Sequence, residues 1–276
     1  LTYSAPMYIE MTPVLNNVES DPVTVNFGDL PVMVKSRICP LANLSREDLI
    51  KAGEDPDDPG GYFIVNGTER ILVLVEEIAT NRIITAKTST GNVTDIARIH
   101  SEKDGYVQRH LLERKKDGIV TISFANINKL PVAILLKALG LESDKAIVSA
   151  ISADPEVQEE FMINLLEIEV PNKDAGLDEI GKHIKIPQKE YRMDRAVKLV
   201  DRYLLPHLGQ ESSNRLDKGM FLAKAIGKVL RLHLNKIEED DLDHYSNKRL
   251  RLSGDLLEIL LRSILLGKWG LITRIT

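Results

Sequence analysis

The spacing of apolar residues changes along the chain, from short alternating runs to helical stripes. Residues 7–11 and 31–34 partly alternate apolar and polar side chains, which indicates strands of a mixed sheet. Residues 53–61 are dense in Gly, Pro and Asp, so we expect a loop there. The N-terminal part is therefore predicted to be rich in β-structure.

Turn-forming pairs predict how the next strands connect. Residues 62–73 hold two apolar runs around Asn66-Gly67, the strongest short-range signal of a two-residue β-hairpin. Further strands are predicted over residues 93–100, 107–112 and 119–124. The segments between them end in Asp104-Gly105 and Asp117-Gly118, so we expect an antiparallel meander.

From residue 130 the apolar spacing becomes helical. The expected helices lie around residues 146–151, 155–165, 193–204, 217–234 and 256–266. Val170-Pro171 and residues 172–176 indicate a break, where the chain is expected to return to its first domain. The order of β-rich, mixed and then helical segments predicts an α+β fold. The final helix is apolar on more than one face, so it must be buried in its own core or against a partner.

Composition narrows the class of protein. The chain has 276 residues, 43% hydrophobic and 28% charged, which fits one large or two modest soluble domains. The lone Cys39 excludes a disulfide framework and a multi-cysteine zinc site, and is expected to be a small buried apolar residue. No apolar run reaches the about 18 residues of a membrane span, and no signal pattern is seen, so a cytoplasmic protein is expected. The start at Leu1 suggests a piece of a longer polypeptide.

The charge balance limits how the chain could contact nucleic acid. The formal net charge is −5, with 36 Lys and Arg against 41 Asp and Glu. This balance argues against a protein that coats DNA with its whole surface. Any contact with nucleic acid is expected to come from local basic clusters.

An acidic cluster changes to a basic one within residues 238–251. The carboxylates of residues 238–243 could bind magnesium for phosphotransfer, or form a solvated acidic loop. Lys248, Arg249 and Arg251 could bind phosphates, or pair internally with neighbouring carboxylates. Both pairs of alternatives stay open from the sequence.

Two further groups could carry chemistry. Asp243 could orient His244 for acid-base work, but no nucleophile completes a triad, so Asp241, Asp243 and His244 are predicted to organise the loop. The other histidines show no metal-ligand spacing. A second basic cluster is expected at an exposed hairpin tip, where it would serve solubility or contact DNA: Arg114, Lys115 and Lys116. We predict no catalytic and no metal-binding residue.

Three motifs in this order resemble the second-largest subunit of cellular RNA polymerases, most closely its archaeal form. Residues 61–73 read GYFIVNGTERILV, residues 131–140 read PVAILLKALG, and residues 240–254 read DDLDHYSNKRLRLSG. The resemblance reaches to about residue 262. Ser246 stands where many relatives have glycine, and residues 266–271 depart from the family's pattern, so no role is assigned to Lys268 or Arg274.

The resemblance implies a domain plan and a function. Residues 1–80 would be the first part of a protrusion domain, residues 81–170 an inserted lobe, residues 171–235 the second part of the protrusion, and residues 236–276 the start of the fork. The chain would form one side of a DNA cleft without catalytic groups, because the family's magnesium-binding aspartates belong to the largest subunit. Implied partners are the other polymerase subunits, double- and single-stranded DNA, and transcription factors. The competing hypotheses are a free-standing scaffold and a metal-dependent enzyme that uses the carboxylates of residues 238–243.

Overall fold

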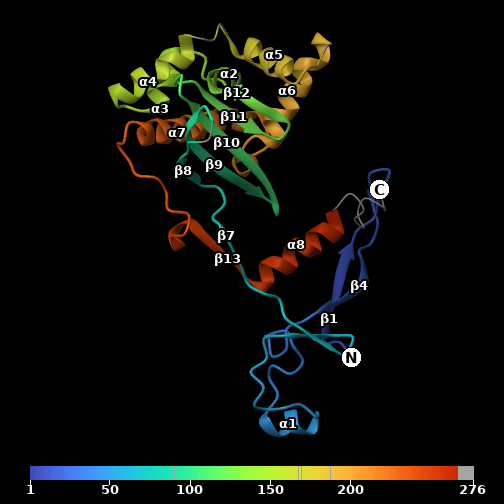
Figure 1. Cartoon of the computed structure of the whole chain (residues 1–276). Helices are drawn as coiled ribbons and strands as arrows, with labels where there is room; N and C mark the ends of the chain where they lie inside the picture. The colour runs from blue at the N-terminus through green and yellow to red at the C-terminus, as the bar shows by residue number, and fades with distance from the viewer. Residues whose placement is uncertain (90, 167, 169, 187, 267–276) are drawn as a thin grey trace. The chain divides into compact units, whose positions relative to one another are not determined.

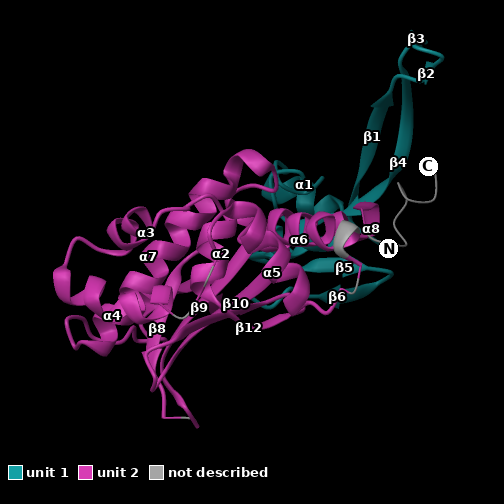
Figure 2. Ribbon diagram, turned by 90° about the horizontal axis from the view of Figure 1, so that it is seen from above, with its two compact units in different colours: residues 1–75, 251–260 teal, residues 76–250, 261–276 magenta. Residues whose placement is uncertain are grey.

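The chain folds into two compact units in the computed structural model, which describes residues 1–89, 91–166, 168, 170–186 and 188–266. Unit 1 comprises residues 1–75 and 251–260, and unit 2 comprises residues 76–250 and 261–276 (Figure 2). Each unit contains its own buried cluster of apolar side chains. No helix of the described residues combines the length and apolar character of a membrane span.

Unit 1 is built on β-hairpins (Figure 1). Its elements are β1 (Ser4–Met11), β2 (Val14–Leu15), β3 (Val18–Glu19), β4 (Val23–Pro31), α1 (Arg46–Lys51), β5 (Phe63–Val65) and β6 (Thr68–Arg70). Strands β1 and β4 pair antiparallel, and β2 and β3 pair at the tip of that hairpin. Strands β5 and β6 form the hairpin expected around Asn66 and Gly67, whose φ angles of 51° and 75° suit a two-residue turn.

One strand of unit 1 lies elsewhere than predicted. A strand was expected over residues 31–34, but the strand observed there, β4, ends at Pro31. Val32 and Val34 instead leave the hairpin and fill the small core of unit 1 together with Cys39, whose predicted burial is confirmed. Their backbone N–H groups donate to Tyr3 and Tyr62 carbonyls, so the segment is held without belonging to a sheet.

The β1/β4 hairpin presents apolar side chains to solvent. The register places Ile9 opposite Val25 and Met11 opposite Val23, so these four share one face of the ribbon. All four are at least 37% exposed. A two-stranded ribbon is marginal by itself, so this face is suited to packing against another structure.

Unit 2 contains the predicted meander, extended at both edges. Its sheet has the order β12-β11-β10-β9-β8 and is antiparallel throughout. The strands are β8 (Ile83–Lys87), β9 (Val93–Lys103), β10 (Tyr106–Lys115), β11 (Val120–Phe124) and β12 (Ile127–Pro131). Asp104, Gly105 and Gly118 have the positive φ angles expected of the Asp-Gly turns. The edge strands β8 and β12 were not predicted from the sequence.

Helices cover one face of this sheet (Figure 2). They are α2 (Val132–Ala138), α3 (Asp144–Ile151), α4 (Pro155–Leu166), α5 (Lys173–His183), α6 (Lys189–Tyr203) and α7 (Arg215–His233). The buried cluster joins Ala97, Ile99 and Leu112 of the sheet to helical residues from Val132 to Leu230. Residues 81–170 and 171–235 therefore share one core. Their assignment to separate lobe and protrusion domains stays a prediction.

The break expected at Val170-Pro171 and over residues 172–176 is wrong from Lys173 onward, where α5 begins. Asn172 ends the break, because its side-chain oxygen accepts the Ala175 N–H at 2.9 Å and caps α5. Gly176 lies inside that helix, where a Cβ would stand 3.0 Å from the Ala138 backbone nitrogen. The glycine that suggests a break in the sequence instead permits close packing of α5 on α2.

The three remaining strands and α-helices each include residues of both units. Strand β7 (Val75–Ile78) pairs with β13 (Lys248–Arg251), and helix α8 runs over Ser253–Leu266. None of the side chains of α8 is buried, although its sequence is strongly apolar, and Leu260 is 56% exposed. Of the two predicted alternatives, burial in the chain's own core is not seen among the described residues of α8, and burial against a partner stays a prediction. Consecutive antiparallel strands followed by helices give the predicted α+β class. The doubtful segment 267–276, with Lys268 and Arg274, lies outside the described residues.

Candidate nucleic-acid interface

Residues 239 and 240, at the acidic end of the segment 238–251, form hydrogen bonds with the free edge of the sheet. Strand β8 has β9 on one side only. On its other side the Asp240 N–H donates to the Thr85 carbonyl at 2.9 Å, and the Thr85 N–H and hydroxyl donate to the Asp240 carboxylate at 2.7 and 2.8 Å. The Glu239 carboxylate accepts the Lys87 N–H at 3.2 Å. We name residues 239 and 240 the edge latch, because they satisfy backbone groups that an edge strand leaves open.

Lys228 of α7 completes the latch. Its ammonium lies 2.6 Å from the Asp240 carboxylate and 2.9 Å from the Ile83 carbonyl. Burial of Asp240 disfavours its charged form, but the hydrogen bonds from Lys228 and Thr85 outweigh it, so the pKa of Asp240 lies below its usual value. Asp240 is thus a structural anion that pairs with a lysine.

The magnesium hypothesis finds no support in this arrangement. The Asp240 carboxylate binds Thr85 and Lys228, and Glu239 reaches the Lys87 backbone. Within the described part of the chain, no three His, Cys, Asp or Glu side chains are placed to hold a metal ion. The alternative of a phosphotransfer enzyme built on residues 238–243 is not supported.

Replacing Asp240 with alanine should release the latch. The Thr85 N–H then loses its side-chain acceptor and Lys228 loses its counterion, at a cost of about 1–3 kcal/mol of unfolding free energy. Native-state hydrogen exchange should show faster exchange of the Thr85 amide. Asp241→Ala is the matched control, because its carboxylate accepts only within the loop. Unchanged protection of Thr85 in Asp240→Ala would disprove the latch.

The loop after the latch is organised by its own polar groups. The Asp241 carboxylate accepts the Asp243 N–H at 2.8 Å, and the Asp241 carbonyl accepts the Asn247 side chain at 2.7 Å. The His244 Nδ1 accepts the Ser246 N–H at 3.1 Å and lies 2.7 Å from its hydroxyl. Ser246 lies in a right-handed 3-10 turn over Tyr245–Asn247, so a serine there is unstrained.

The basic residues follow on β13. The Lys248 ammonium lies 2.5 Å from Glu76 of β7 and 3.7 Å from Asp243. The hydrogen bond from Lys248 to Glu76 raises the pKa of Lys248 above its usual value. Arg249 is half exposed and lies 3.9 Å from Glu102. Arg251 is only 5% exposed, which leaves Lys248 and Arg249 as the cations of this strand that can face an external phosphate.

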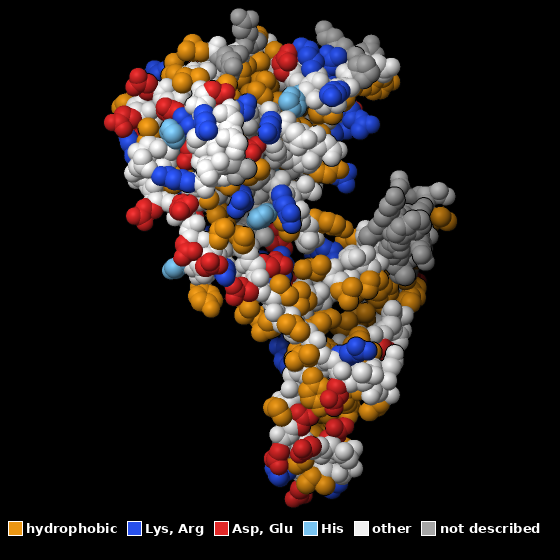
Figure 3. Space-filling view, viewed as in Figure 1, with side chains coloured by type: hydrophobic (Ala, Val, Ile, Leu, Met, Phe, Trp, Pro, Cys, Tyr) orange, Lys and Arg blue, Asp and Glu red, His pale blue; other side chains and the backbone are white. Residues whose placement is uncertain are grey.

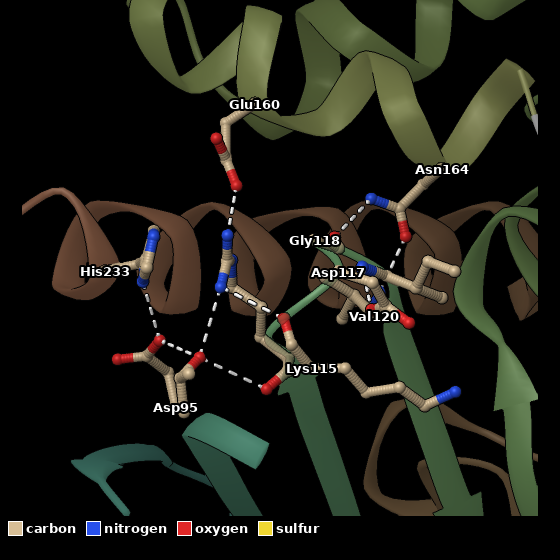
Figure 4. A network of polar contacts seen from close by, with 11 residues as sticks. Asp95, Lys115, Asp117, Gly118, Val120, Glu160, Asn164 and His233 are labelled. Atoms are coloured by element: carbon tan, nitrogen blue, oxygen red, sulfur yellow. Dashed lines mark hydrogen bonds and ion pairs between the residues drawn. The ribbon is translucent and has the colours of Figure 1, made fainter. Parts of the chain in front are cut away.

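The structure corrects the position of Arg114. It was expected at an exposed tip, but its side chain is 6% exposed and pairs with Glu160 of α4. Its guanidinium also donates to the Thr94 hydroxyl and the Lys115 carbonyl, both at 3.1 Å. Figure 4 shows this network between β9, β10 and α4. Arg114 faces inward on β10, since it lies opposite buried Asp95 and Val120, so it belongs to the fold and not to a contact surface.

The other two residues of that cluster remain accessible. Lys116 is exposed at the turn, and Lys115 is half-buried beside it. The turn is fixed by Asn164 of α4, whose side chain accepts the Val120 N–H at 2.7 Å and donates to the Gly118 carbonyl at 3.1 Å (Figure 4). Lys115 also lines a depression of about 530 Å³, together with Lys129 and Thr121.

The two predicted basic clusters do not form one site. Lys115 lies opposite Val93 at the start of β9, whereas Arg249 approaches Glu102 near its end. Nine residues of strand at about 3.4 Å each separate these places, roughly 30 Å. Figure 3 shows cationic and anionic side chains interspersed over this part of the molecule. Any contact with an extended nucleic acid would therefore be made at separate points.

Comparisons with known proteins identify the family. The family model described as RNA polymerase Rpb2, domain 2, matches residues 79–251. Relatives named DNA-directed RNA polymerase subunit Rpo2 are 44% identical in Sulfolobus acidocaldarius and 47% identical in Saccharolobus solfataricus, over 95% of this chain and 24% of theirs. Subunit Rpo2N of Methanococcus vannielii is 41% identical over 95% of this chain and 55% of its own length. The chain spans between about a quarter and about half of these curated relatives.

The chain belongs to the Rpb2 family of RNA polymerase subunits. Within that family it covers an N-terminal portion of the archaeal second subunit, which confirms the resemblance found in the motifs. The matched region begins directly after β7 and ends at Arg251, the last residue of β13. It therefore includes the edge latch, the loop and the basic strand.

Proposed function

We propose that this chain forms one wall of the DNA cleft of a multisubunit, DNA-directed RNA polymerase and holds DNA without performing catalysis. The observation that carries the proposal is the way in which the motif at residues 240–254 is attached to the sheet of unit 2. The edge latch ties its acidic end to the sheet, and Lys248 and Arg249 follow within ten residues on β13. This attachment holds the two cations in a fixed position. Contacts to phosphate set the register of a protein on DNA, and they require cations that are held in place.

The finer domain plan forms part of this proposal. Residues 1–80 and 171–235 would belong to the protrusion, residues 81–170 to the lobe, and residues 236–276 to the start of the fork, which keeps DNA strands apart. Catalytic magnesium would be bound by the largest subunit and not by this chain. The polymerase would act in the cytoplasm, with double- and single-stranded DNA in its cleft and transcription factors on its surface.

Exposed apolar surfaces support a place within a larger assembly. The β1/β4 ribbon exposes Val14, Leu15 and Val18 at its tip by 60–74%. Apolar side chains at such exposure are typical of surfaces that another protein covers. We propose that the ribbon and α8 contact other parts of the polymerase.

Removing the cations of β13 should weaken DNA binding in a salt-dependent way. In polymerase reconstituted with the subunit that carries Lys248→Ala and Arg249→Ala, removal of each phosphate contact should make the slope of log K against log salt shallower by about 0.9. The measurement is the affinity for duplex DNA across a salt series. Lys145→Ala with Lys224→Ala is the matched control, since both are exposed lysines on helices. An unchanged slope in the β13 variant would mean that these residues serve internal ion pairs only.

A further inference from the structure

A cluster of arginines lies on the sheet face that the helices leave uncovered. Along β9 the residues Ala97 and Ile99 point into the core, so Arg98 and His100 point to the opposite face. On β10, Arg109 lies directly opposite His100, and Leu111 lies opposite Arg98. Arg98 and Arg109 are exposed, and His100 is half-buried between them.

The cluster extends to the neighbouring strand. Arg82 directly precedes β8, and the Asn81 N–H donates to the His100 carbonyl at 2.7 Å, which brings the start of β8 alongside His100. The Arg82 guanidinium is exposed and donates to the Ser246 backbone carbonyl. Two guanidinium groups thus come from the neighbouring strands β9 and β10, and the third comes from the residue directly before β8.

The arginines of this cluster have no carboxylate partner among the described residues. Neither the Arg98 nor the Arg109 side chain forms an ion pair or a hydrogen bond with the part of the chain that the structure describes, and the Arg82 guanidinium donates to a neutral carbonyl. The Glu102 carboxylate nearby faces Arg249. Like charges on neighbouring strands destabilise a sheet. Unneutralised arginines side by side are therefore expected where an external anion binds.

The environment of His100 agrees with this local excess of positive charge. Its pKa lies below the usual value, first because of burial and then because of Arg109 and Arg98. The imidazole is held neutral at ordinary pH, so it can donate or accept a hydrogen bond between the two guanidinium groups.

We propose that Arg98 and Arg109, supported by His100 and Arg82, bind the phosphate backbone of double-stranded nucleic acid on the open face of the sheet. The inference rests on the proposed function and adds a separate site to it. Diagonal neighbours on paired strands lie about 7–8 Å apart. That spacing lets two guanidinium groups engage successive phosphates, each with paired N–H donors.

The rest of the face favours a duplex over a single strand. Its other outward positions that reach solvent on β8 to β11 include small, aliphatic, hydroxyl and acidic residues: Ala86, Glu102, Val107, Leu111, Glu113 and Ser123. Ile84, Ile96 and Thr121 are buried. Single-strand binding sites stack bases on aromatic side chains, and no Phe, Tyr or Trp is among these positions. Contacts restricted to the backbone are independent of base sequence.

The test uses the reconstituted polymerase with Arg98→Ala and Arg109→Ala. The expected result is a slope of log K against log salt for duplex DNA that is shallower by about 1.8, since two guanidinium groups no longer bind phosphate. Single-stranded DNA should show a smaller change. Lys145→Ala with Lys224→Ala again serves as the control, because α3 and α7 lie on the helical side of unit 2. An unchanged slope, or an equal change for single-stranded DNA, would overturn the proposal.

A photo-crosslinking amino acid at position 98 identifies the partner directly. Crosslinks to duplex DNA are expected, and crosslinks to a protein alone would show that the cluster binds an acidic protein segment instead. The two double variants also separate this proposal from the proposed function. If Lys248→Ala with Arg249→Ala changes the slope of log K against log salt and Arg98→Ala with Arg109→Ala does not, only the arginine site fails. If the reverse is found, the proposed role of β13 fails and the arginine site stands.

Discussion

Gly227→Ala should destabilise unit 2 by about 2–4 kcal/mol, a large fraction of the stability of an ordinary domain. A Cβ on Gly227 of α7 would stand 2.3 Å from the Ile151 carbonyl oxygen at the end of α3. That oxygen belongs to the backbone, so the clash can be relieved only by separating two helices that share the core. The higher helix propensity of alanine recovers at most about 1 kcal/mol.

Gly219 provides the matched control in the same helix. A Cβ there would meet Leu139 and Leu141 side chains at 3.4 Å, which is ordinary van der Waals contact. Gly219→Ala should therefore be neutral or stabilising by up to about 1 kcal/mol. Denaturant unfolding of both variants separates local crowding from helix propensity. Equal midpoints for the two variants would contradict the close approach of α7 and α3.

Acid should weaken the fold through His110. Burial lowers the pKa of His110 to about 4 from an ordinary value of 6.5. Below pH 6.5 the unfolded chain binds a proton that the folded chain rejects, so the stabilisation is fully present above pH 6.5 and is lost as the pH falls toward 4. A shift of this size corresponds to roughly 3 kcal/mol at the most.

The geometry explains what the proton would disrupt. His110 stacks on Phe124, and its Nε2 accepts the Leu205 N–H at 3.1 Å. Leu205 has a φ of 43°, a left-handed conformation that costs energy for a residue with a side chain. A protonated Nε2 can donate to the Tyr203 carbonyl 3.2 Å away but can no longer accept this hydrogen bond, so the Leu205 N–H in the turn before Pro206 loses its acceptor.

His110→Gln isolates this contribution, because glutamine can accept the same hydrogen bond without titrating. The unfolding free energy of the variant should fall less steeply between pH 6.5 and pH 4.5 than that of the unmodified chain. His207 keeps part of the dependence, since burial lowers its pKa as well. If His110→Gln kept the full pH dependence of the unfolding free energy, other groups would be its cause.

Local signals were sufficient for much of the fold. Asn66-Gly67 and Asp104-Gly105 predict hairpins because their positive φ is a property of the residues themselves. Asp154-Pro155 likewise predicts the start of α4 at Pro155. The strand β8 escaped prediction because its outer edge is satisfied by Asp240, about 150 residues further along the chain.

The candidate site was harder to predict for the same reason. Arg114, Lys115 and Lys116 look alike in sequence, but the alternation of β10 turns Arg114 inward. Its burial is compensated by the ion pair with Glu160 of α4 and by hydrogen bonds to Thr94 and Lys115. The arginines at 98 and 109 are separated in sequence and become neighbours only through the register of β9 and β10. The alternation of Ala97, Arg98, Ile99 and His100 on β9 carried a signal for that face.

The most direct test of the non-catalytic, DNA-holding role compares two rates in one elongation complex. Polymerase with Lys248→Ala and Arg249→Ala should add the next nucleotide at a rate within about twofold of the unmodified enzyme. The lifetime of the same complex should shorten by at least about tenfold when salt is raised, because the two cations no longer hold phosphates. A large loss in the rate of nucleotide addition, with an unchanged lifetime, would contradict the account.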